Sequence, residues 1–193
     1  MFLLCKPSAL AIRAFLDSQA GLDFTYPAVG ATAAEPPPGY VVDHTRIRLG
    51  AGRSTFTAAL AALQRWEHFC LGWVEPCWPN TPIEPGQVVA ILARVCGLWC
   101  LNACRIVYIV SEDDPLKRFG FAYGTLPDHV ESGEERFTIE WHERDDSVWY
   151  NILAFSRPNH LLVRLGYPLV RRLQKQFARD SAAAMVRAVT RVL

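Results

Sequence analysis

The sequence lacks the residue spacings on which several well-known functional sites depend. None of the six cysteines pairs at the two-residue spacing of a zinc knuckle, and the histidines do not cluster near them. Gly50-Ala51-Gly52 precedes an expected helix, but no Gly-Lys-Ser/Thr follows as in a phosphate-binding loop. Ser156 lies near His160 without the Gly-x-Ser-x-Gly pattern of hydrolases. We therefore expect no metal and no cofactor, and we interpret the cysteines as reduced thiols of a cytoplasmic protein.

The sequence also has little net charge and few long apolar runs. The net charge is only +1, which gives no reason to expect a nucleic-acid partner. The longest apolar stretch, residues 87–110, contains Arg94 and Arg105, and each would cost about 2.5–3.5 kcal/mol at the centre of a bilayer. This stretch is therefore expected to form two buried strands rather than a transmembrane segment. Met1–Cys5 is apolar but too short for a signal peptide.

The length predicts one domain. A chain of 193 residues can bury a full hydrophobic core, so we expect a single domain over residues 1–193. Within it, residues 1–39 are expected to form a short N-terminal helix over 8–18 and then a Pro- and Gly-rich arm that covers the remainder. Residues 40–193 are expected to form the core.

The core has a distinctive order of predicted elements. Apolar residues alternate along 40–49, which predicts a strand, and Ser54 is expected to cap a helix after it. Gaps rich in Gly, Pro or Asp, such as the turn at Pro115, separate six further predicted strands. These lie at 68–76, 87–96, 103–111, 118–125, 135–142 and 147–156. A long helix is predicted to begin at Tyr167-Pro168, with an apolar stripe that continues to Val192. This order predicts an α+β fold in which a curved antiparallel sheet of about seven strands wraps around the C-terminal helix.

The order of elements resembles the helix-grip fold of the START and Bet v 1-like superfamily, also called polyketide cyclase-like or SRPBCC. That resemblance implies an apolar ligand held between the sheet and the last helix. Local strings are also similar to a family of bacterial and plant proteins known only as a domain of unknown function. They are VDHTRIRLGAGRSTF (42–56), GLWCLNACRIVY (97–108), YGTLPDHVESGEE (123–135), AFSRPNH (154–160) and RLQKQFARDSAAAM (172–185). This second resemblance supports the same fold and implies no activity or catalytic residues.

The densest polar stretch, residues 123–135, supplies the first candidate site. His129 lies there beside several carboxylates, including Glu134, and such neighbours can tune an imidazole for acid–base catalysis or help it bind a divalent metal. A solvated acidic hairpin loop is the alternative interpretation. Glu140 is a further acid–base candidate, although the alternation over 135–142 places it outside the cavity unless a bulge shifts the register.

Five other residues are candidates for contact with a ligand. Tyr123 lies among phenylalanines, which suits an apolar cavity with one polar anchor, and Tyr108 and Trp149 are expected to line the same space. Ordinary core packing is the alternative for these three. Arg94 and Arg105 interrupt apolar strands, and a buried arginine needs either a carboxylate of the protein or the acidic head of a ligand.

Together these features favour a protein that binds or carries a small apolar or amphipathic molecule between sheet and helix. The first alternative is an enzyme of the cyclase, dehydratase or isomerase type that acts on an apolar substrate in the same cavity. Titratable side chains with abnormal pKa values inside the cavity would favour that enzyme. The second alternative is a module that binds a partner through the basic face of the last helix.

Overall fold

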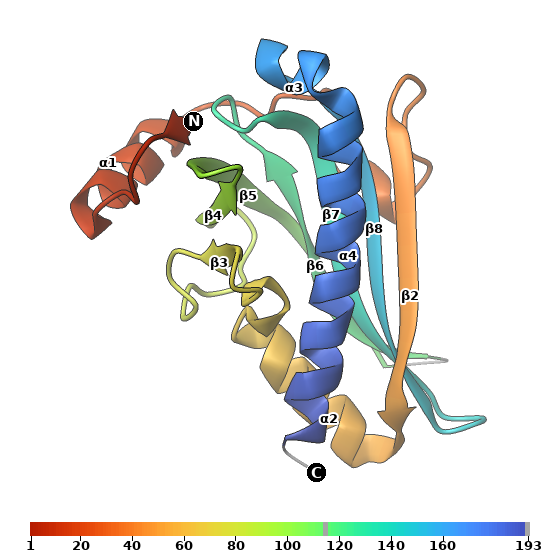
Figure 1. The fold of residues 1–193 in the computed structure, drawn as a ribbon. Coiled ribbons are helices and arrows are strands. Elements are labelled where there is room, and N and C mark those ends of the chain that lie inside the picture. The colour runs from red at the N-terminus through yellow and green to blue at the C-terminus, as the bar shows by residue number, and fades with distance from the viewer. Residues whose placement is uncertain (114–115, 192–193) are drawn as a thin grey trace.

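A curved antiparallel sheet forms the frame of the computed structural model, which describes residues 1–113 and 116–191 (Figure 1). The main strands pair in the order β2-β8-β7-β6-β5-β4-β3. Their bounds are Val41–Ala51 (β2), Val74–Pro76 (β3), Val88–Val95 (β4), Leu98–Glu112 (β5), Lys117–Thr125 (β6), Glu131–His142 (β7) and Ser147–Pro158 (β8). A short strand β1 (Phe2–Leu3) also pairs with β5. Pro115 and Val192, predicted to lie in a turn and on the helix stripe, fall outside the described residues.

One long helix covers the concave face of this sheet (Figure 1). Helix α4 (Tyr167–Thr190) carries Pro168 in its first turn, where the missing N–H of proline costs nothing. The other helices are α1 (Ala9–Gln19), α2 (Gly52–Gln64) and α3 (Leu161–Leu165), with single 3₁₀ turns η1 (Ala31–Ala33) and η2 (Glu67–Phe69). The architecture is therefore the α+β, helix-grip arrangement that the sequence predicts. No helix in the described ranges is both long and apolar enough to cross a membrane.

The apolar stretch 87–110 forms two paired strands, as predicted. β4 and β5 pair from Val88↔Arg105 to Val95↔Leu98, and the turn between them is Cys96-Gly97. Both turn residues have positive φ, 50° and 81°, which is the geometry of a two-residue turn whose twist matches that of the flanking strands. Glycine adopts this conformation at no steric cost.

The structure corrects three boundaries. Helix α2 begins at Gly52, with φ of 86°, rather than after a Ser54 cap. The strand predicted over 68–76 is reduced to Val74–Pro76, because Trp66 (φ 58°) turns the chain into η2 and buries the adjacent aromatic side chains. β7 begins at Glu131 rather than at residue 135, so the acidic stretch lies in the sheet and not in a solvated loop.

Only part of the space between the sheet and α4 is filled by side chains. Trp66, Phe69, Phe137 and Tyr150 are all less than 2% exposed, and they pack beside α2 with Met185 from the C-terminal half of α4. Each fully buried side chain of this size contributes about 1.5–3 kcal/mol. The C-terminal half of α4 is therefore fixed in a solid core, whereas its N-terminal half covers a cavity.

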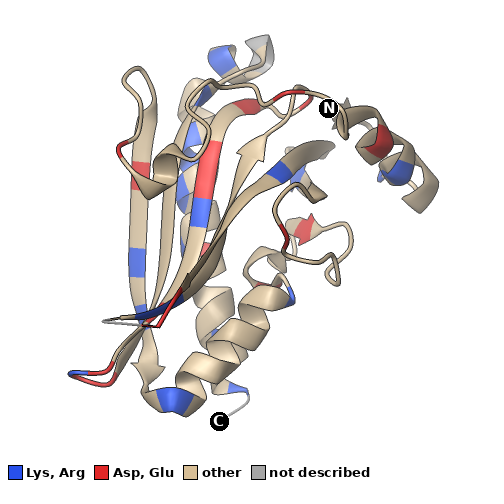
Figure 2. Cartoon of the chain, turned by 180° about the vertical axis from the view of Figure 1, so that it is seen from behind, with Lys and Arg blue, Asp and Glu red and all other residues tan. Residues whose placement is uncertain are grey.

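The arm of residues 21–39 crosses the outer face of the sheet (Figure 2). Tyr26 is 3% exposed, and its hydroxyl lies so close to Gly124 that a Cβ at this position would overlap it. The backbone N–H of Thr25 donates to the carbonyl oxygen of Thr125 at 3.0 Å. Gly124 therefore provides the space in which the arm packs on β6.

Candidate functional site

A cavity of about 810 Å³ lies between the concave face of the sheet and the N-terminal half of α4. Its walls are mainly apolar and include Trp73, Ile91, Ile152, Val170, Leu173 and Phe177. Ligand sites of small molecules typically have volumes of roughly 300–1,000 Å³ and a few polar groups among apolar walls. The cavity therefore has the size and lining of a small-molecule site.

A tyrosine and a glutamate form one polar pair in this cavity. Tyr123 on β6 and Glu135 on β7 are directly paired across the sheet, so their side chains share a face. The Tyr123 hydroxyl donates a hydrogen bond of 2.9 Å to Glu135 Oε2, and both residues border the cavity. Glu135 also continues the alternation of Phe137 and Ile139, which carries the apolar face of β7.

Burial keeps this pair uncharged. The pKa of Glu135 is raised from 4.5 to about 8, chiefly because burial disfavours the carboxylate, while the Tyr123 hydrogen bond offsets part of the rise. The negative charges of Glu131 and Asp43 raise the same pKa further. Burial also raises the pKa of Tyr123 well above its usual value. At neutral pH, Glu135 is therefore mostly a neutral carboxylic acid that can donate or accept a proton.

A second polar group links the start of β7 to α4. Gln174 on α4 donates from Nε2 to Glu131 Oε1 at 2.5 Å and contacts Ser156 Oγ at 3.0 Å. Burial raises the pKa of Glu131, and the Gln174 hydrogen bond offsets part of that rise. Arg171, one turn before Gln174, instead binds Asp43 on β2, with Nη2 at 2.7 Å from Oδ1. The nearest guanidinium therefore already has a carboxylate partner.

His129 borders the cavity from the turn before β7. Its Nδ1 lies 3.0 Å from both the backbone nitrogen and the backbone oxygen of Glu131, which fixes the ring against the strand. Burial lowers the pKa of His129 to about 4. The imidazole is therefore neutral at physiological pH, and its hydrogen-bond partner is the backbone of Glu131 rather than a side-chain carboxylate.

Glu134 holds the arm. Its carboxylate accepts hydrogen bonds from the Tyr26 hydroxyl and the Gly30 N–H, both at 2.7 Å, and from the N–H and hydroxyl of Thr32. The residue is 2% exposed, and although it borders the cavity, every one of these bonds leads to the outer face. The side chains of Glu134 and Glu135 therefore lie on opposite faces of β7, as the alternation of side chains along a strand requires.

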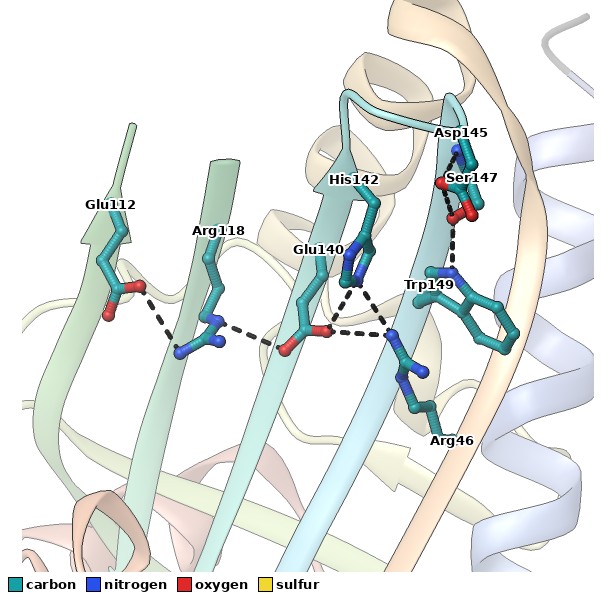
Figure 3. Close-up of polar contacts among 8 residues, drawn as sticks. All are labelled: Arg46, Glu112, Arg118, Glu140, His142, Asp145, Ser147 and Trp149. Atoms are coloured by element: carbon teal, nitrogen blue, oxygen red, sulfur yellow. Dashed lines mark hydrogen bonds and ion pairs between the residues drawn. The ribbon is translucent and has the colours of Figure 1, made fainter. Parts of the chain in front are cut away.

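Glu140 and Trp149 lie on the outer face, away from the cavity (Figure 3). Glu140 on β7 is 3.2 Å from Arg118 Nε on the adjacent strand β6 and 3.5 Å from Arg46 Nη2, which reaches it from β2 across β8. The Arg46 guanidinium stacks over the Trp149 ring at 4.1 Å, and the indole N–H donates to Ser147 Oγ. The register has no bulge that would turn Glu140 inward.

The three remaining ligand candidates also lie outside the cavity lining. The Tyr108 hydroxyl is 2.8 Å from Thr32 Oγ1, beneath the arm. Arg105 donates to the backbone oxygens of Ala20 and Leu22, which follow α1, at 2.7 and 2.9 Å. Arg94 is exposed and lies over the Trp99 ring. Of the five predicted ligand contacts, Tyr123 alone borders the cavity.

The sequence comparisons agree with this description. A family model described as a domain of unknown function, DUF1990, matches residues 25–184. The chain belongs to the DUF1990 family. A UPF0548 protein of Dictyostelium discoideum is 40% identical over 98% of this chain and 96% of its own length. A UPF0548 protein of Arabidopsis thaliana is 37% identical over 78% of this chain and 74% of its own length.

Solved structures support the fold of this DUF1990 chain. A START superfamily protein of Mycobacterium smegmatis aligns with a TM-score of 0.54 and 15% identity, covering 80% of this chain and 100% of that protein. The fold is therefore START-like, as the order of elements predicted. At this identity the likeness concerns the fold alone.

The polar groups that border the cavity of the DUF1990 chain include the carboxyl groups of Glu131 and Glu135, the Gln174 amide and the Tyr123 hydroxyl. Within residues 1–113 and 116–191, no group of three or more His, Cys, Asp or Glu side chains is placed to hold a metal ion. Sequence reasoning singled out His129 and Glu134 but missed Glu135 and Gln174 as groups that border the cavity. Glu135 could have been found from strand parity, because it falls on the same alternation as Phe137, Ile139 and Trp141.

Proposed function

We propose that this protein binds or carries a small apolar or amphipathic molecule in the cavity beneath α4. The observation that carries the proposal is the combination of about 810 Å³ of mainly apolar space with a few polar groups, chiefly Tyr123 and Glu135. Such a lining buries a hydrophobic ligand while the polar groups fix its orientation. All six cysteines are free, which suits a reducing compartment such as the cytoplasm.

A substitution that fills the cavity tests the proposal. Ala154 on β8 borders the cavity, whereas its neighbour Leu153 points to the opposite face, so Ala154→Phe and Leu153→Phe form a matched pair. Binding of the neutral fluorophore N-phenyl-1-naphthylamine is measured by its emission. We expect Ala154→Phe to weaken binding at least about fivefold, or about 1 kcal/mol, because the added ring occupies space and apolar wall that the fluorophore would otherwise use. Equal binding by both variants, or no binding by the wild type, would refute the proposal.

Protein purified from its own host gives an independent test. Native mass spectrometry is expected to show a bound species that extraction with organic solvent releases. The Ala154→Phe variant is expected to carry less of it than Leu153→Phe. Repeated absence of any bound molecule, together with no fluorophore binding, would leave the cavity without a role.

An enzyme in the same cavity is a second candidate, and the Tyr123–Glu135 pair favours it. A carboxylic acid with a pKa of about 8 can exchange a proton with a substrate near neutral pH, and the Tyr123 hydroxyl is in contact with it. This assigns acid–base work to Glu135; of the sequence candidates, His129 and Glu134 also border the cavity, whereas Glu140 lies on the outer face. In screens for cyclase, dehydratase and isomerase activity, Glu135→Gln should abolish turnover while fluorophore binding persists. Unchanged turnover in that variant would remove Glu135 from the mechanism.

A further inference from the structure

Two of the carboxyl groups that border the cavity, Glu131 and Glu135, have no ion-paired cation among the described residues, although the nearby charge of Arg171 lowers the pKa of Glu131. No ion pair in the described ranges includes Glu131 or Glu135. Glu131 is held by the neutral amide of Gln174, and Glu135 by the neutral hydroxyl of Tyr123. A buried carboxyl group without a cation is normally an unfavourable feature, because its ionised form is poorly solvated. Both groups nevertheless border a space large enough for a ligand.

No cation of the described residues is among the groups that shift the pKa of Glu135. The groups that interact with it electrostatically come from five strands and are Asp43 (β2), Cys104 (β5), Tyr123 (β6), Glu131 (β7) and Tyr150 (β8). From α4, Arg171 is bound to Asp43, and Gln174 is uncharged. Lys175 and Arg179 also border the cavity, but both are exposed, and neither forms an ion pair with a carboxylate of the cavity.

Charge complementarity then indicates the polar end of the ligand. We infer that the cavity selects amphipathic molecules whose polar group is a protonated amine, with the ammonium beside Glu135 and the apolar part against the walls beneath α4. An ammonium group would supply the cation that the protein lacks at this point. A carboxylate ligand such as a fatty acid would find no cation beside Glu135 and would lose its hydration without an opposite charge, which costs affinity. This inference rests on the proposed binding function and names its ligand class.

Ligands of equal chain length separate the inference from the proposed function. Decylamine, decan-1-ol and decanoate are each used at pH 7 to displace N-phenyl-1-naphthylamine from the full chain. We expect decylamine to bind about tenfold more tightly than decan-1-ol, because coupling energies of close charge pairs at interfaces are about 1.5 kcal/mol or more. Decanoate is expected to bind more weakly than the alcohol.

Variants and proton release identify the group responsible. Within the Glu135→Gln variant, decylamine should bind no more tightly than decan-1-ol, whereas Glu140→Gln, on the outer face, should keep the wild-type preference for the amine. Binding of an ammonium ion beside a neutral acid converts it to a carboxylate and releases its proton to solvent. Calorimetry in buffers of different ionisation enthalpy should therefore show about one proton released per decylamine by the wild type and none by Glu135→Gln. If Glu135→Gln does not fold, Tyr123→Phe is used, which leaves the carboxyl group in place and should retain the amine preference and proton release.

Each outcome decides a different point. If the fluorophore binds but decylamine and decan-1-ol compete equally, the inference is overturned and the proposed binding function stands. The same holds if decanoate binds most tightly, or if amine binding releases no proton. If the fluorophore does not bind to the wild type at all, both the proposed function and the inference fail.

Discussion

Replacing Glu135 by glutamine should stabilise the protein, and the gain should grow as the pH rises. Glutamine keeps an oxygen that can accept the Tyr123 hydrogen bond but has no proton to lose. In the folded wild type, burial raises the pKa of Glu135 to about 8, whereas its value in the unfolded chain is close to 4.5. Between these values the unfolded state ionises and the folded state does not. The contribution of Glu135 to the free energy of unfolding is therefore fully present below pH 4.5, and it is lost as the pH rises towards 8.

The size of this effect follows from the two pKa values. At about 1.36 kcal/mol per pKa unit, linkage lowers the wild-type unfolding free energy by about 1 kcal/mol at pH 5 and by about 4 kcal/mol at pH 7.5. The advantage of Glu135→Gln should thus increase by about 3 kcal/mol between these pH values. Other titrating groups are common to both chains and largely cancel in the difference.

Urea unfolding followed by tryptophan fluorescence measures this difference directly, because the chain contains six tryptophans. Glu140→Gln makes the same chemical change on the outer face, where Arg118 and Arg46 accompany the carboxylate. That control should lose only a modest ion-pair contribution. An equal difference between Glu135→Gln and wild type at both pH values would refute the argument, because it would mean that the carboxyl group ionises as readily in the fold as in the unfolded chain.

Three further variants test the core, the sheet and the arm. His68 is fully buried, both of its ring nitrogens lack a hydrogen-bond partner, and burial lowers its pKa to about 3. His68→Phe should therefore stabilise the fold, and urea titrations should show about 2 kcal/mol more stabilisation at pH 5 than at pH 8. A difference from wild type that does not depend on pH would contradict this prediction. Gly120→Ala places a Cβ against the carbonyl oxygen of Phe137 and should cost roughly 1–3 kcal/mol in thermal unfolding, whereas Gly21→Ala, with open space around it, should not. Glu134→Gln leaves buried hydrogen-bond donors of the arm without an acceptor, and each unsatisfied donor costs roughly 1–3 kcal/mol. Limited proteolysis should therefore cleave residues 21–39 faster in this variant than in wild type. Equal cleavage rates would show that other contacts hold the arm.

The fold could be predicted from local signals because the elements are strongly marked. Glycine and proline separate the strands, and the apolar stripe of the last helix requires a surface to cover. The boundary at β7 was missed for a physical reason. Glu131, Ser132 and Glu134 read as a polar loop, and the contacts that allow them to lie in the sheet come from Gln174 and from the arm, both distant in sequence.

The site was predicted less well, since side-chain direction decides it. Arg94 and Arg105 were interpreted as buried charges that need a carboxylate, but Arg94 is exposed and Arg105 binds backbone oxygens at the end of α1. No local sequence pattern predicts such a contact between residues far apart in the chain. Trp149 pairs with Arg46 on the outer face, although an aromatic side chain in a strand suggests an inward position. Glu135 is the opposite case: it was not predicted, although its alternation with Phe137 and Ile139 indicates the inward face.

The two halves of helix α4 have different surroundings, and this limits the routes by which the proposed ligand could enter the cavity. Its C-terminal half is anchored by Met185 and its neighbours among the aromatic side chains, so displacing that half would require unfolding the protein. Its first turns cover the cavity instead, and Leu169 in these turns and Leu165 at the end of α3 are exposed. A ligand should therefore enter and leave at the α3 end of the cavity, by rotation of α4 about its buried C-terminal half. The rate of ligand exchange should then depend on the junction near Gly166 rather than on the global stability of the protein.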